Sequence, residues 1–330
     1  MKNIFKALLF IIACLTLFSS CKKTTIDTDD FDTGGYILVD SYKKHPDWVL
    51  KIGGADVTFA EYRHYYLNTK NELDGGTADF WKDHPEYESV LKNKVEAILI
   101  EMYSVRKLCR DAGISSDIDE IYASISQYKK DMTSSEFDRG LEKFYLTEAL
   151  YAYKLEGYQL YDFLYEYYFG ENGKRAMNDK EIVDYAKEYY THTEHILVYP
   201  NTSMSEDDYE KHLNTILERV NNGEDFGALI AEYSNDADTP DYGCYFIDKE
   251  MNESYVAAAK ELEIGETSDL VKTPDGYYII KRLPVNENDT QVLRDIIYNR
   301  KYADMIESTI ESISVEYCPE YDYIAPDTFN

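Results

Sequence analysis

The chain has 330 residues, which is long enough for two domains with separate hydrophobic cores. Hydrophobic residues make up 44% of it and charged residues 29%, a balance typical of a folded globular protein and unlike a disordered or multi-span membrane chain. The formal net charge of −29 argues against nucleic acid as a partner, because phosphate binding needs a basic surface.

The first twenty residues are predicted to be a processing signal. Lys2 and Lys6 precede an apolar run from Ala7 to Phe18, which is shorter than the roughly 20 residues of a membrane-spanning helix. The run ends in Leu17-Phe18-Ser19-Ser20-Cys21, which resembles a bacterial lipobox, although Phe18 stands where leucine is usual. We therefore expect residues 1–20 to be a lipoprotein signal peptide and a lipid on Cys21 to hold the protein at the extracytoplasmic side of the cell membrane. An ordinary secretory signal is the alternative.

The segment after Cys21 is predicted to be a tether followed by a helical domain. Residues 21–45 are polar and read as a flexible linker. Residues 48–54 form a predicted strand and a Gly-Gly turn, and Thr58 is expected to cap the next helix in a capping box with Glu61. Further helices are predicted over 90–113, 116–132 and 134–169, the last of them broken near Gly157.

Two features of this helical region indicate how its helices pack. The helix over 90–113 carries a stripe of apolar residues at spacings of three and four, which predicts a buried face. The region up to residue 169 is crowded with tyrosine, for which we favour a role in helix packing over the alternative of a peptide-binding wall. The stripe comprises Val95, Ile98, Met102, Val105 and Cys109.

Residues 191–285 have the pattern of a small α/β domain. Strands are predicted at 194–199, 270–273 and 277–283, and helices at 206–222, 225–233 and 253–262. Residues 234–243 form a loop rich in aspartate, asparagine, proline and glycine. A final helix with an apolar stripe is predicted over 290–313.

The motifs along residues 191–285 resemble, in order and spacing, those of the parvulin family of peptidyl-prolyl cis-trans isomerases. The opening at residues 48–58 is similar to the start of the chaperone domain in SurA- and PrsA-type foldases. The motifs are His195-Ile196-Leu197-Val198, Gly223-Glu224-Asp225-Phe226, Tyr233-Ser234-Asn235-Asp236, Gly243, Met251, Gly265-Glu266-Thr267-Ser268 and Gly276-Tyr277-Tyr278-Ile279-Ile280-Lys281.

The resemblance implies a set of site residues in this chain. By their positions in the motifs, His195, Asp236 and Ser268 correspond to the polar catalytic centre of the family. Met251 and Tyr255 correspond to its slot for a proline ring, and Tyr242 and Phe246 are expected to contribute to substrate binding. Tyr278 occupies the catalytic position where the family usually has a second histidine, and Tyr255 stands where phenylalanine is usual. These two departures put the catalytic activity in question.

The resemblance also implies an architecture and a function. We expect an α+β protein in which a mainly helical chaperone domain carries an inserted parvulin-like domain. Its expected divisions are a helical domain at 46–190, an isomerase domain at 191–285, a helix returning to the helical domain at 286–316, and a loosely ordered tail at 317–330.

The function implied is a membrane-anchored extracytoplasmic foldase that binds unfolded secreted polypeptides and isomerises their X-Pro bonds. The alternatives are a non-catalytic holdase chaperone with a degenerate parvulin domain, and a surface lipoprotein that binds one specific partner. No metal or cofactor is expected, because the histidines and the three remaining cysteines (Cys109, Cys244 and Cys318) lack ligand spacing.

Overall fold

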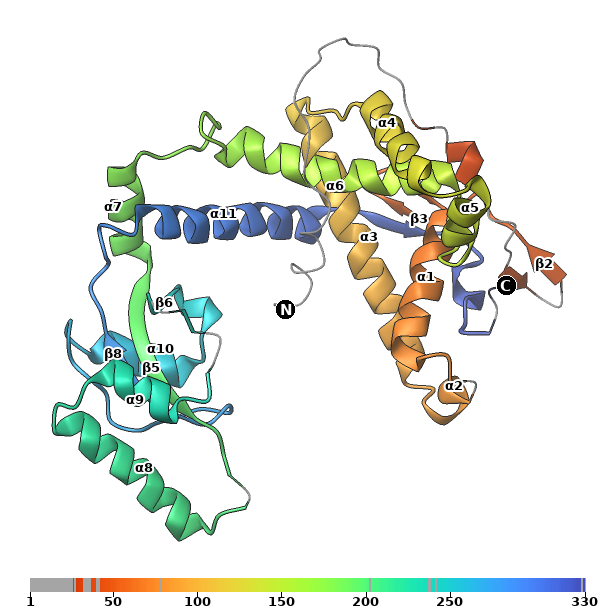
Figure 1. Ribbon diagram of the computed structural model, residues 1–330. Coiled ribbons are helices and arrows are strands. Elements are labelled where there is room, and N and C mark those ends of the chain that lie inside the picture. Colours follow the sequence, from red (N-terminus) through yellow and green to blue (C-terminus); the bar gives the residue numbers. More distant parts are fainter. Residues whose placement is uncertain are drawn as a thin grey trace. The chain divides into compact units, whose positions relative to one another are not determined.

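Figure 1 shows the computed structural model of the chain, which describes residues 26, 28–31, 37–39, 42–77, 79–201, 203–236, 239–240, 242–327 and 329. The predicted signal peptide, Cys21 and about half of the predicted tether lie outside the described residues. No helix among the described residues is long and apolar enough to cross a membrane. The described residues divide into two compact units, one formed by those up to residue 164 together with those from residue 308 onward, and the other by those of the range 165–307.

The first unit combines helices with a small antiparallel sheet. The sheet has the order β4 (Ala55–Thr58), β3 (Trp48–Ile52) and β9 (Val315–Tyr317), so it joins the two ends of the described chain. Short elements precede it, namely η2 (Thr28–Phe31) and the hairpin of β1 (Ile37–Val39) and β2 (Tyr42–Lys44). Its helices are α1 (Phe59–Asp74), α2 (Phe80–Asp83), α3 (Tyr87–Ala112), α4 (Ile118–Tyr128), α5 (Ser134–Glu142) and most of α6 (Glu148–Phe169), with η3 (Lys129–Asp131) following α4.

The segment after residue 316 is packed, so the expectation of a loosely ordered tail was wrong. Cys318, Ile324 and Phe329 are all buried and join the core formed by α1, α3 and β3. The short helix η5 (Tyr321–Tyr323) lies between them. Pro319 and Pro326 are typical of irregular structure, but the buried apolar residues between and beside them anchor the segment.

Three local expectations in the helical unit are corrected. The predicted break near Gly157 lies instead at residues 143–147, where Tyr145 has φ of +59°, and Gly157 is inside α6. A Cβ at Gly157 would lie 3.3 Å from Nη2 of Arg106, so this glycine lets α3 approach α6 closely. Ile98 is not part of the buried stripe, since 38% of it is exposed, and Leu99 is buried instead.

The third correction concerns the start of α1. Thr58 caps the helix as expected, its side chain accepting a hydrogen bond from the backbone N–H of Glu61. Glu61 does not complete the capping box, because its side chain turns into the core and accepts a 2.7 Å hydrogen bond from the Tyr103 hydroxyl. The other carboxyl oxygen, Oε1, has no hydrogen-bond partner among the described residues. Burial raises the pKa of Glu61 to about 7.

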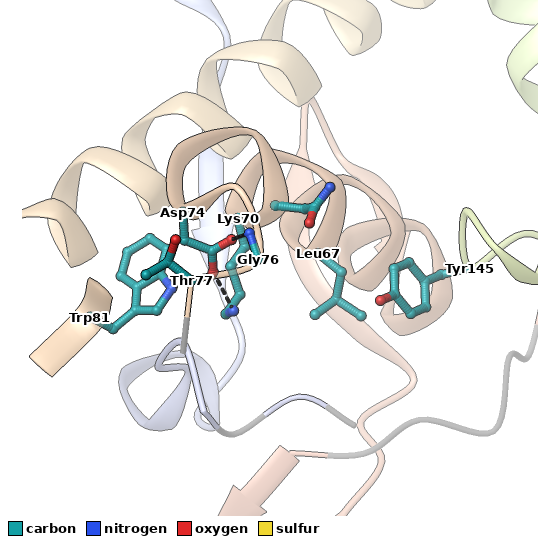
Figure 2. Close-up of a pocket in the computed structure, with 8 residues that line it drawn as sticks. Leu67, Lys70, Asp74, Gly76, Thr77, Trp81 and Tyr145 are labelled. Atoms are coloured by element: carbon teal, nitrogen blue, oxygen red, sulfur yellow. Dashed lines mark hydrogen bonds and ion pairs between the residues drawn. The ribbon is translucent and has the colours of Figure 1, made fainter. Parts of the chain in front are cut away.

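A hollow of about 170 Å³ lies at the far end of α1, and Figure 2 shows the side chains that line it. Asp74 is its central group, and this carboxylate accepts hydrogen bonds from Lys70, from the Trp81 indole and from the backbone N–H of Gly76. These donors hold the pKa of Asp74 below its usual value despite burial. Because these donors already satisfy the carboxylate, we interpret the hollow as part of the way in which α1 ends and not as a ligand site.

The second unit contains a four-stranded antiparallel sheet of order β6-β5-β8-β7. Its strands are β5 (Thr191–Val198), β6 (Cys244–Phe246), β7 (Val271–Lys272) and β8 (Tyr277–Arg282). Helices α8 (Glu206–Asn221), α9 (Phe226–Tyr233) and α10 (Glu253–Glu261) accompany it, as Figure 1 shows. The predicted elements of residues 191–285 are present, and β6 and the short helix η4 (Asp248–Glu250) are additional.

Two layers of side chains cover the two faces of this sheet. Ile196 and Val198 of β5 pack with α8 and α9 on one face, whereas Leu197 packs with α10 on the other. A third apolar cluster joins the end of α6 to α7 (Asp179–Tyr189) and to α11 (Thr290–Ser312) through Phe169, Ile182 and Leu293. Residues 165–190 and 286–307 thus belong to the same compact unit as the sheet.

Candidate functional site

The strand register places His195 and Tyr278 on one face of the four-stranded sheet. In β5, successive side chains alternate between faces, so His195 shares a face with Leu197. In the β5–β8 ladder His195 pairs with Ile280 and Leu197 pairs with Tyr278, which makes His195 and Tyr278 diagonal neighbours. Their ring centroids are 5.1 Å apart in an edge-to-face arrangement. Both side chains therefore face α10.

Helix α10 brings Tyr255 against this pair. The Tyr255 ring lies edge-to-face on His195 at 5.6 Å and on Tyr278 at 5.1 Å. Phe246 of β6 contacts the other side of Tyr255 at 5.6 Å. Pairs of rings in this geometry stabilise a cluster by about 0.5–1.5 kcal/mol each beyond their buried area. Tyr255, Tyr278 and Phe246 thus form one aromatic cluster with the imidazole of His195.

A chain of hydrogen bonds runs through the cluster. Nε2 of His195 lies 3.1 Å from Oδ2 of Asp236, and Nδ1 lies 3.0 Å from the hydroxyl of Tyr255. Because a carboxylate only accepts, Nε2 carries the proton and Nδ1 accepts from Tyr255. The Tyr255 hydroxyl in turn accepts from Thr193 at 2.8 Å. The resulting order, Thr193 to Tyr255 to His195 to Asp236, satisfies a neutral imidazole on both nitrogens.

The environment of the imidazole favours its neutral form. Burial lowers the pKa of His195, and the hydrogen bond and charge of Asp236 only partly oppose this shift. His195 is 3% exposed and Tyr255 is 1% exposed. Burial, with the carboxylates of Asp275 and Asp236, also raises the pKa of Tyr278 to about 12, so this phenol stays protonated at neutral pH. The cluster therefore offers a neutral imidazole and a neutral phenol.

The remaining predicted residues differ in how they relate to this centre. Met251 is half-buried and packs against the cluster that holds Tyr255 and Tyr278. Tyr242 is 41% exposed. Ser268 is not part of the hydrogen-bond chain, since its hydroxyl donates to the carbonyl of Asp269 and accepts from the backbone N–H of Ile280. In this structure Ser268 holds the backbone of β8 in place.

Sequence reasoning missed three residues that shape the site. Thr193 bonds Tyr255, and Thr239 donates a 2.7 Å hydrogen bond to Oδ2 of Asp236. His192 stacks on Tyr245 at 3.8 Å, and its two ring nitrogens lie within 2.7 Å of the carbonyl oxygens of Pro284 and Tyr242. Strand alternation places Thr193 on the same face as His195, which is the one signal that could have identified it.

Gly243 shows why the loop can approach β5 so closely. It has φ of +82°, and a Cβ there would lie 2.7 Å from the carbonyl oxygen of Thr193 and 2.9 Å from Nε2 of His192. Any other residue would be strained by its backbone conformation and would also collide with β5. This glycine therefore sets the position of the strand that carries Phe246.

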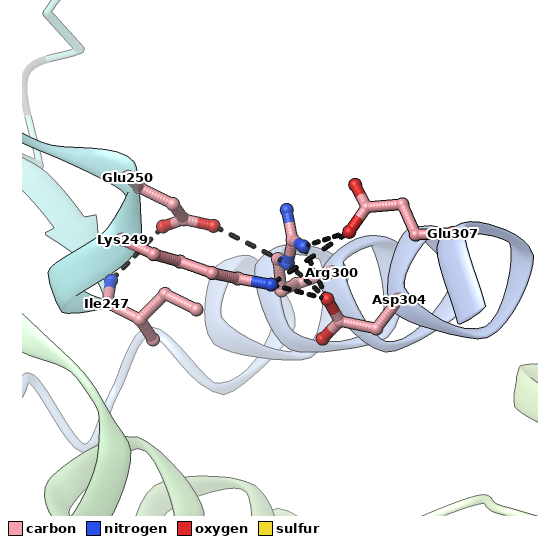
Figure 3. Close-up of polar contacts among 6 residues, drawn as sticks. All are labelled: Ile247, Lys249, Glu250, Arg300, Asp304 and Glu307. Atoms are coloured by element: carbon pink, nitrogen blue, oxygen red, sulfur yellow. Dashed lines mark hydrogen bonds and ion pairs between the residues drawn. The ribbon is translucent and has the colours of Figure 1, made fainter. Parts of the chain in front are cut away.

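A polar network holds the segment that leads to Met251, as Figure 3 shows. Lys249 and Glu250 of η4 face α11, where Lys249 lies 2.9 Å from Asp304 and Arg300 lies 3.8 Å from Glu250. Arg300 also bonds Asp304 and lies 2.8 Å from Glu307. Five charged side chains thus connect η4 to α11 immediately before the proline-slot residue.

Comparisons with known proteins agree with this geometry. Residues 195–283 match the rotamase family described as the PPIC-type PPIase domain. The chain is 26% identical over 247 residues to foldase protein PrsA of Caldanaerobacter subterraneus, which covers 71% of this chain and 72% of that protein. It is 37% identical over 100 residues to foldase protein PrsA 3 of Bacillus cereus, covering 28% of this chain and 35% of that protein.

More distant similarities extend to chaperones and solved structures. Chaperone SurA of Methylobacillus flagellatus is 34% identical over 101 residues, covering 30% of this chain and 23% of that protein. The crystal structure of the peptidylprolyl isomerase PrsA from Bacillus anthracis aligns with 65% of this chain and 94% of that chain, at 20% identity and a TM-score of 0.37. The family match places residues 195–283 in the class of PPIC-type PPIase domains, in agreement with the parvulin-like pattern of the sequence. The similarity to foldase protein PrsA thus extends over most of the chain, whereas the similarity to chaperone SurA is confined to about a third of it.

Proposed function

We propose that this chain is a foldase that binds unfolded polypeptides and accelerates cis-trans exchange at their X-Pro bonds. The observation that carries the proposal is the single cluster of His195, Tyr255 and Tyr278, with Met251 packed beside it, inside a PPIC-type domain. Asp236, whose side chain is 30% exposed, and half-buried Met251 are the members that reach solvent. A substrate would therefore meet these two side chains first.

The reaction needs binding and electrostatics and no covalent step. Rotation about the C–N bond is opposed by amide resonance, with a barrier of about 18–20 kcal/mol, and uncatalysed exchange takes roughly 10–100 s. In our proposal, Met251 and the adjoining aromatic edges seat the pyrrolidine ring away from water. The polarised chain ending at Asp236 then favours the twisted amide over the planar one. No bond forms or breaks, so the neutral His195 needs only to orient its hydrogen bonds.

The cellular setting is part of the same proposal. The relatives carry the names foldase and chaperone, which supports unfolded polypeptides as the clients. The lipobox-like sequence ending in Cys21 supports a lipid anchor that keeps the protein on the extracytoplasmic side of the membrane. The flexible tether expected over residues 21–45 is corrected in part, because η2 and the β1–β2 hairpin lie within it and Phe31 is buried against Ala60 and Leu150. We assign client holding to the helical unit and isomerisation to residues 191–285.

A protease-coupled assay on proline tetrapeptides tests the catalytic claim. We expect the wild-type chain to accelerate exchange above the uncatalysed rate. We expect His195→Ala to lower kcat/KM by about 10-fold or more, because it breaks the hydrogen-bond chain on both sides. Tyr189→Phe is a matched control, since it removes the hydroxyl of an exposed ring in α7, outside the hydrogen-bond chain and the expected substrate-binding residues. Wild-type activity equal to background would contradict the enzyme claim.

A holdase without catalysis is the second candidate, and Tyr278 is the observation that favours it. The phenol stands where the family usually has a second histidine, and it has no hydrogen bond to His195 in the structure. If wild type is inactive but Tyr278→His gains activity, the domain is a degenerate isomerase. Suppressed aggregation of an unfolded client by the inactive chain would then assign it as a holdase. If the chain affects neither X-Pro exchange nor aggregation, a surface lipoprotein with one specific partner becomes the better assignment.

A further inference from the structure

The helical unit contains a second cavity, far in sequence from the isomerase residues. Its volume is about 410 Å³, and its walls come from α1, α3, α6 and the segment that precedes α6. Three of the large apolar side chains that the unit exposes gather at it, since Ile98, Phe144 and Tyr158 are 38%, 49% and 42% exposed. Exposed apolar side chains that gather around a cavity of this size mark a binding site more often than a structural defect.

One cation lies in the wall of this cavity. Lys154 of α6 is half-buried, and its ammonium lies 4.7 Å from the centre of the Tyr65 ring and donates to Nε2 of His64. The charge of Glu61 opposes the lowering of its pKa by burial, but the Glu61 carboxylate forms no ion pair with it among the described residues. An ammonium has three N–H donors. One is used by His64, so the charge is available to a ligand in the cavity.

The partner of Lys154 is held as a neutral acceptor. Nδ1 of His64 lies 2.6 Å from the carbonyl oxygen of Phe144, to which it donates its proton. Nε2 therefore presents a lone pair to Lys154. Burial and the charge of Lys154 lower the pKa of His64 to about 3, so the imidazole does not compete as a second cation. Asn68 reinforces the arrangement by donating to the same carbonyl oxygen at 3.2 Å.

From these contacts we propose that the cavity binds the C-terminal end of a polypeptide, with the terminal carboxylate on Lys154 and an apolar last side chain among the aromatic walls. The inference rests on the proposed function, because it supplies the unfolded chains. A carboxylate attached to an apolar group matches both halves of the site, namely one oriented ammonium and a wall of Ile98, Phe144, Leu146, Tyr151 and Tyr158.

Negative charge at the rim of the cavity excludes polyanions as its ligand. Glu72 lines the same cavity and is exposed, and the whole chain has a net charge of −29. A polyanion such as a nucleic acid or a phosphorylated segment would be repelled. A single carboxylate at the end of an apolar chain brings one negative charge directly to the ammonium, and its contact with Glu72 can be avoided.

The test uses peptides without proline, so that it is independent of the isomerase residues. Acetyl-Ala-Ala-Ala-Ala-Leu would be titrated into the purified full chain as the free acid and as the C-terminal amide, with binding followed by calorimetry. We expect the acid to bind about 10-fold or more tightly than the amide, because the amide loses a charge-assisted hydrogen bond. Lys154→Met should abolish this preference, whereas Lys94→Met on the exposed side of α3 should leave it unchanged. Burial lowers the pKa of Lys154 to about 8, so the preference for the acid should also decline between pH 7 and pH 9.5.

A second variant protects the test against misfolding of Lys154→Met. Ile98→Glu places a negative charge at the exposed mouth of the cavity and should weaken the binding of the peptide acid more than the binding of the peptide amide. Equal affinities of acid and amide for wild type, while the chain still suppresses aggregation of an unfolded client, would overturn this inference and leave the proposed function intact. Absence of both peptide binding and aggregation suppression would count against the proposed function as well. Tight binding of decanoate without binding of the peptide acid would overturn the assignment of a polypeptide C-terminus as the ligand of this cavity.

Discussion

The hydroxyl of Tyr255 is one departure of this domain from the family pattern, which usually has phenylalanine there. The hydroxyl donates to Nδ1 of His195 and accepts from Thr193. It therefore stabilises the neutral imidazole from the side opposite Asp236. A tyrosine at this position gives His195 a second hydrogen-bond partner, which a phenylalanine could not supply, although the second family histidine is absent.

Tyr255→Phe tests that role. Removal of the hydroxyl leaves Nδ1 of His195 and the Thr193 hydroxyl unpaired in a buried site, which should cost about 1–3 kcal/mol of unfolding free energy. The neutral form of His195 loses a hydrogen bond, so the pKa of His195 should rise. Urea unfolding and the NMR titration of the imidazole measure the two effects, with Tyr242→Phe as the exposed control. An unchanged pKa of His195 would show that the hydroxyl does not act on the imidazole.

Glu61 makes the stability of the helical unit depend on pH. Its pKa is about 7 in the folded chain and near the ordinary value of 4.5 when unfolded, so the folded state binds the proton more tightly. Stability is therefore highest below about pH 4.5 and falls as the pH rises toward 7, by about 3 kcal/mol for this group. Glu61→Gln stays neutral and keeps an acceptor for Tyr103. We expect it to be more stable than wild type at pH 8 by up to about 3 kcal/mol.

The comparison must be made at two pH values to isolate this carboxyl. The difference in unfolding free energy between Glu61→Gln and wild type should shrink toward zero near pH 4.5. Glu72→Gln, on the exposed side of the same helix, should change stability by less than about 0.5 kcal/mol at either pH. A Glu61→Gln variant with the same dependence on pH as wild type would refute the assignment.

The helices and strands could be predicted from the sequence, whereas contacts between residues far apart in the chain could not. The elements of residues 191–285 followed from apolar periodicity and turn residues, which are local properties. His195, Tyr255 and Tyr278 could be grouped through family resemblance, and the register of β5 with β8 accounts for the contact between His195 and Tyr278. Ile98 was misplaced because its spacing fits both the buried stripe and the adjacent surface, and only the packing of α3 separates the two.

The charged network between η4 and α11 could likewise not be predicted from the sequence. Lys249 and Arg300 are far apart in the chain, and charged residues on a predicted helix are ordinarily solvated. In the structure they meet across the short segment that precedes Met251. Single exposed ion pairs contribute little to stability. A network that shares Asp304 and Glu307 between two cations restrains the approach to Met251 more effectively than any one pair would.

At the scale of the whole molecule, the helical unit is built from both ends of the described chain. Strand β9 pairs with β3, with Ile52 opposite Val315, and the following segment buries Cys318, Ile324 and Phe329. The sequence between these parts, residues 165–307, forms the other compact unit. The helical unit therefore cannot complete its core until the isomerase domain has been synthesised.

Ile324→Ala tests this dependence in the intact chain. Ile324 is fully buried, so truncation removes apolar contacts and leaves a cavity, which should lower the unfolding free energy of the helical unit by about 2–5 kcal/mol. Tyr323→Ala, at a neighbouring residue that is 42% exposed, should cost under about 1 kcal/mol. Urea unfolding followed by hydrogen exchange assigns the loss to a unit. Protection should fall in α1 and α3 and persist in β5 and β8, and equal loss in both sets would mean that the two units unfold as one.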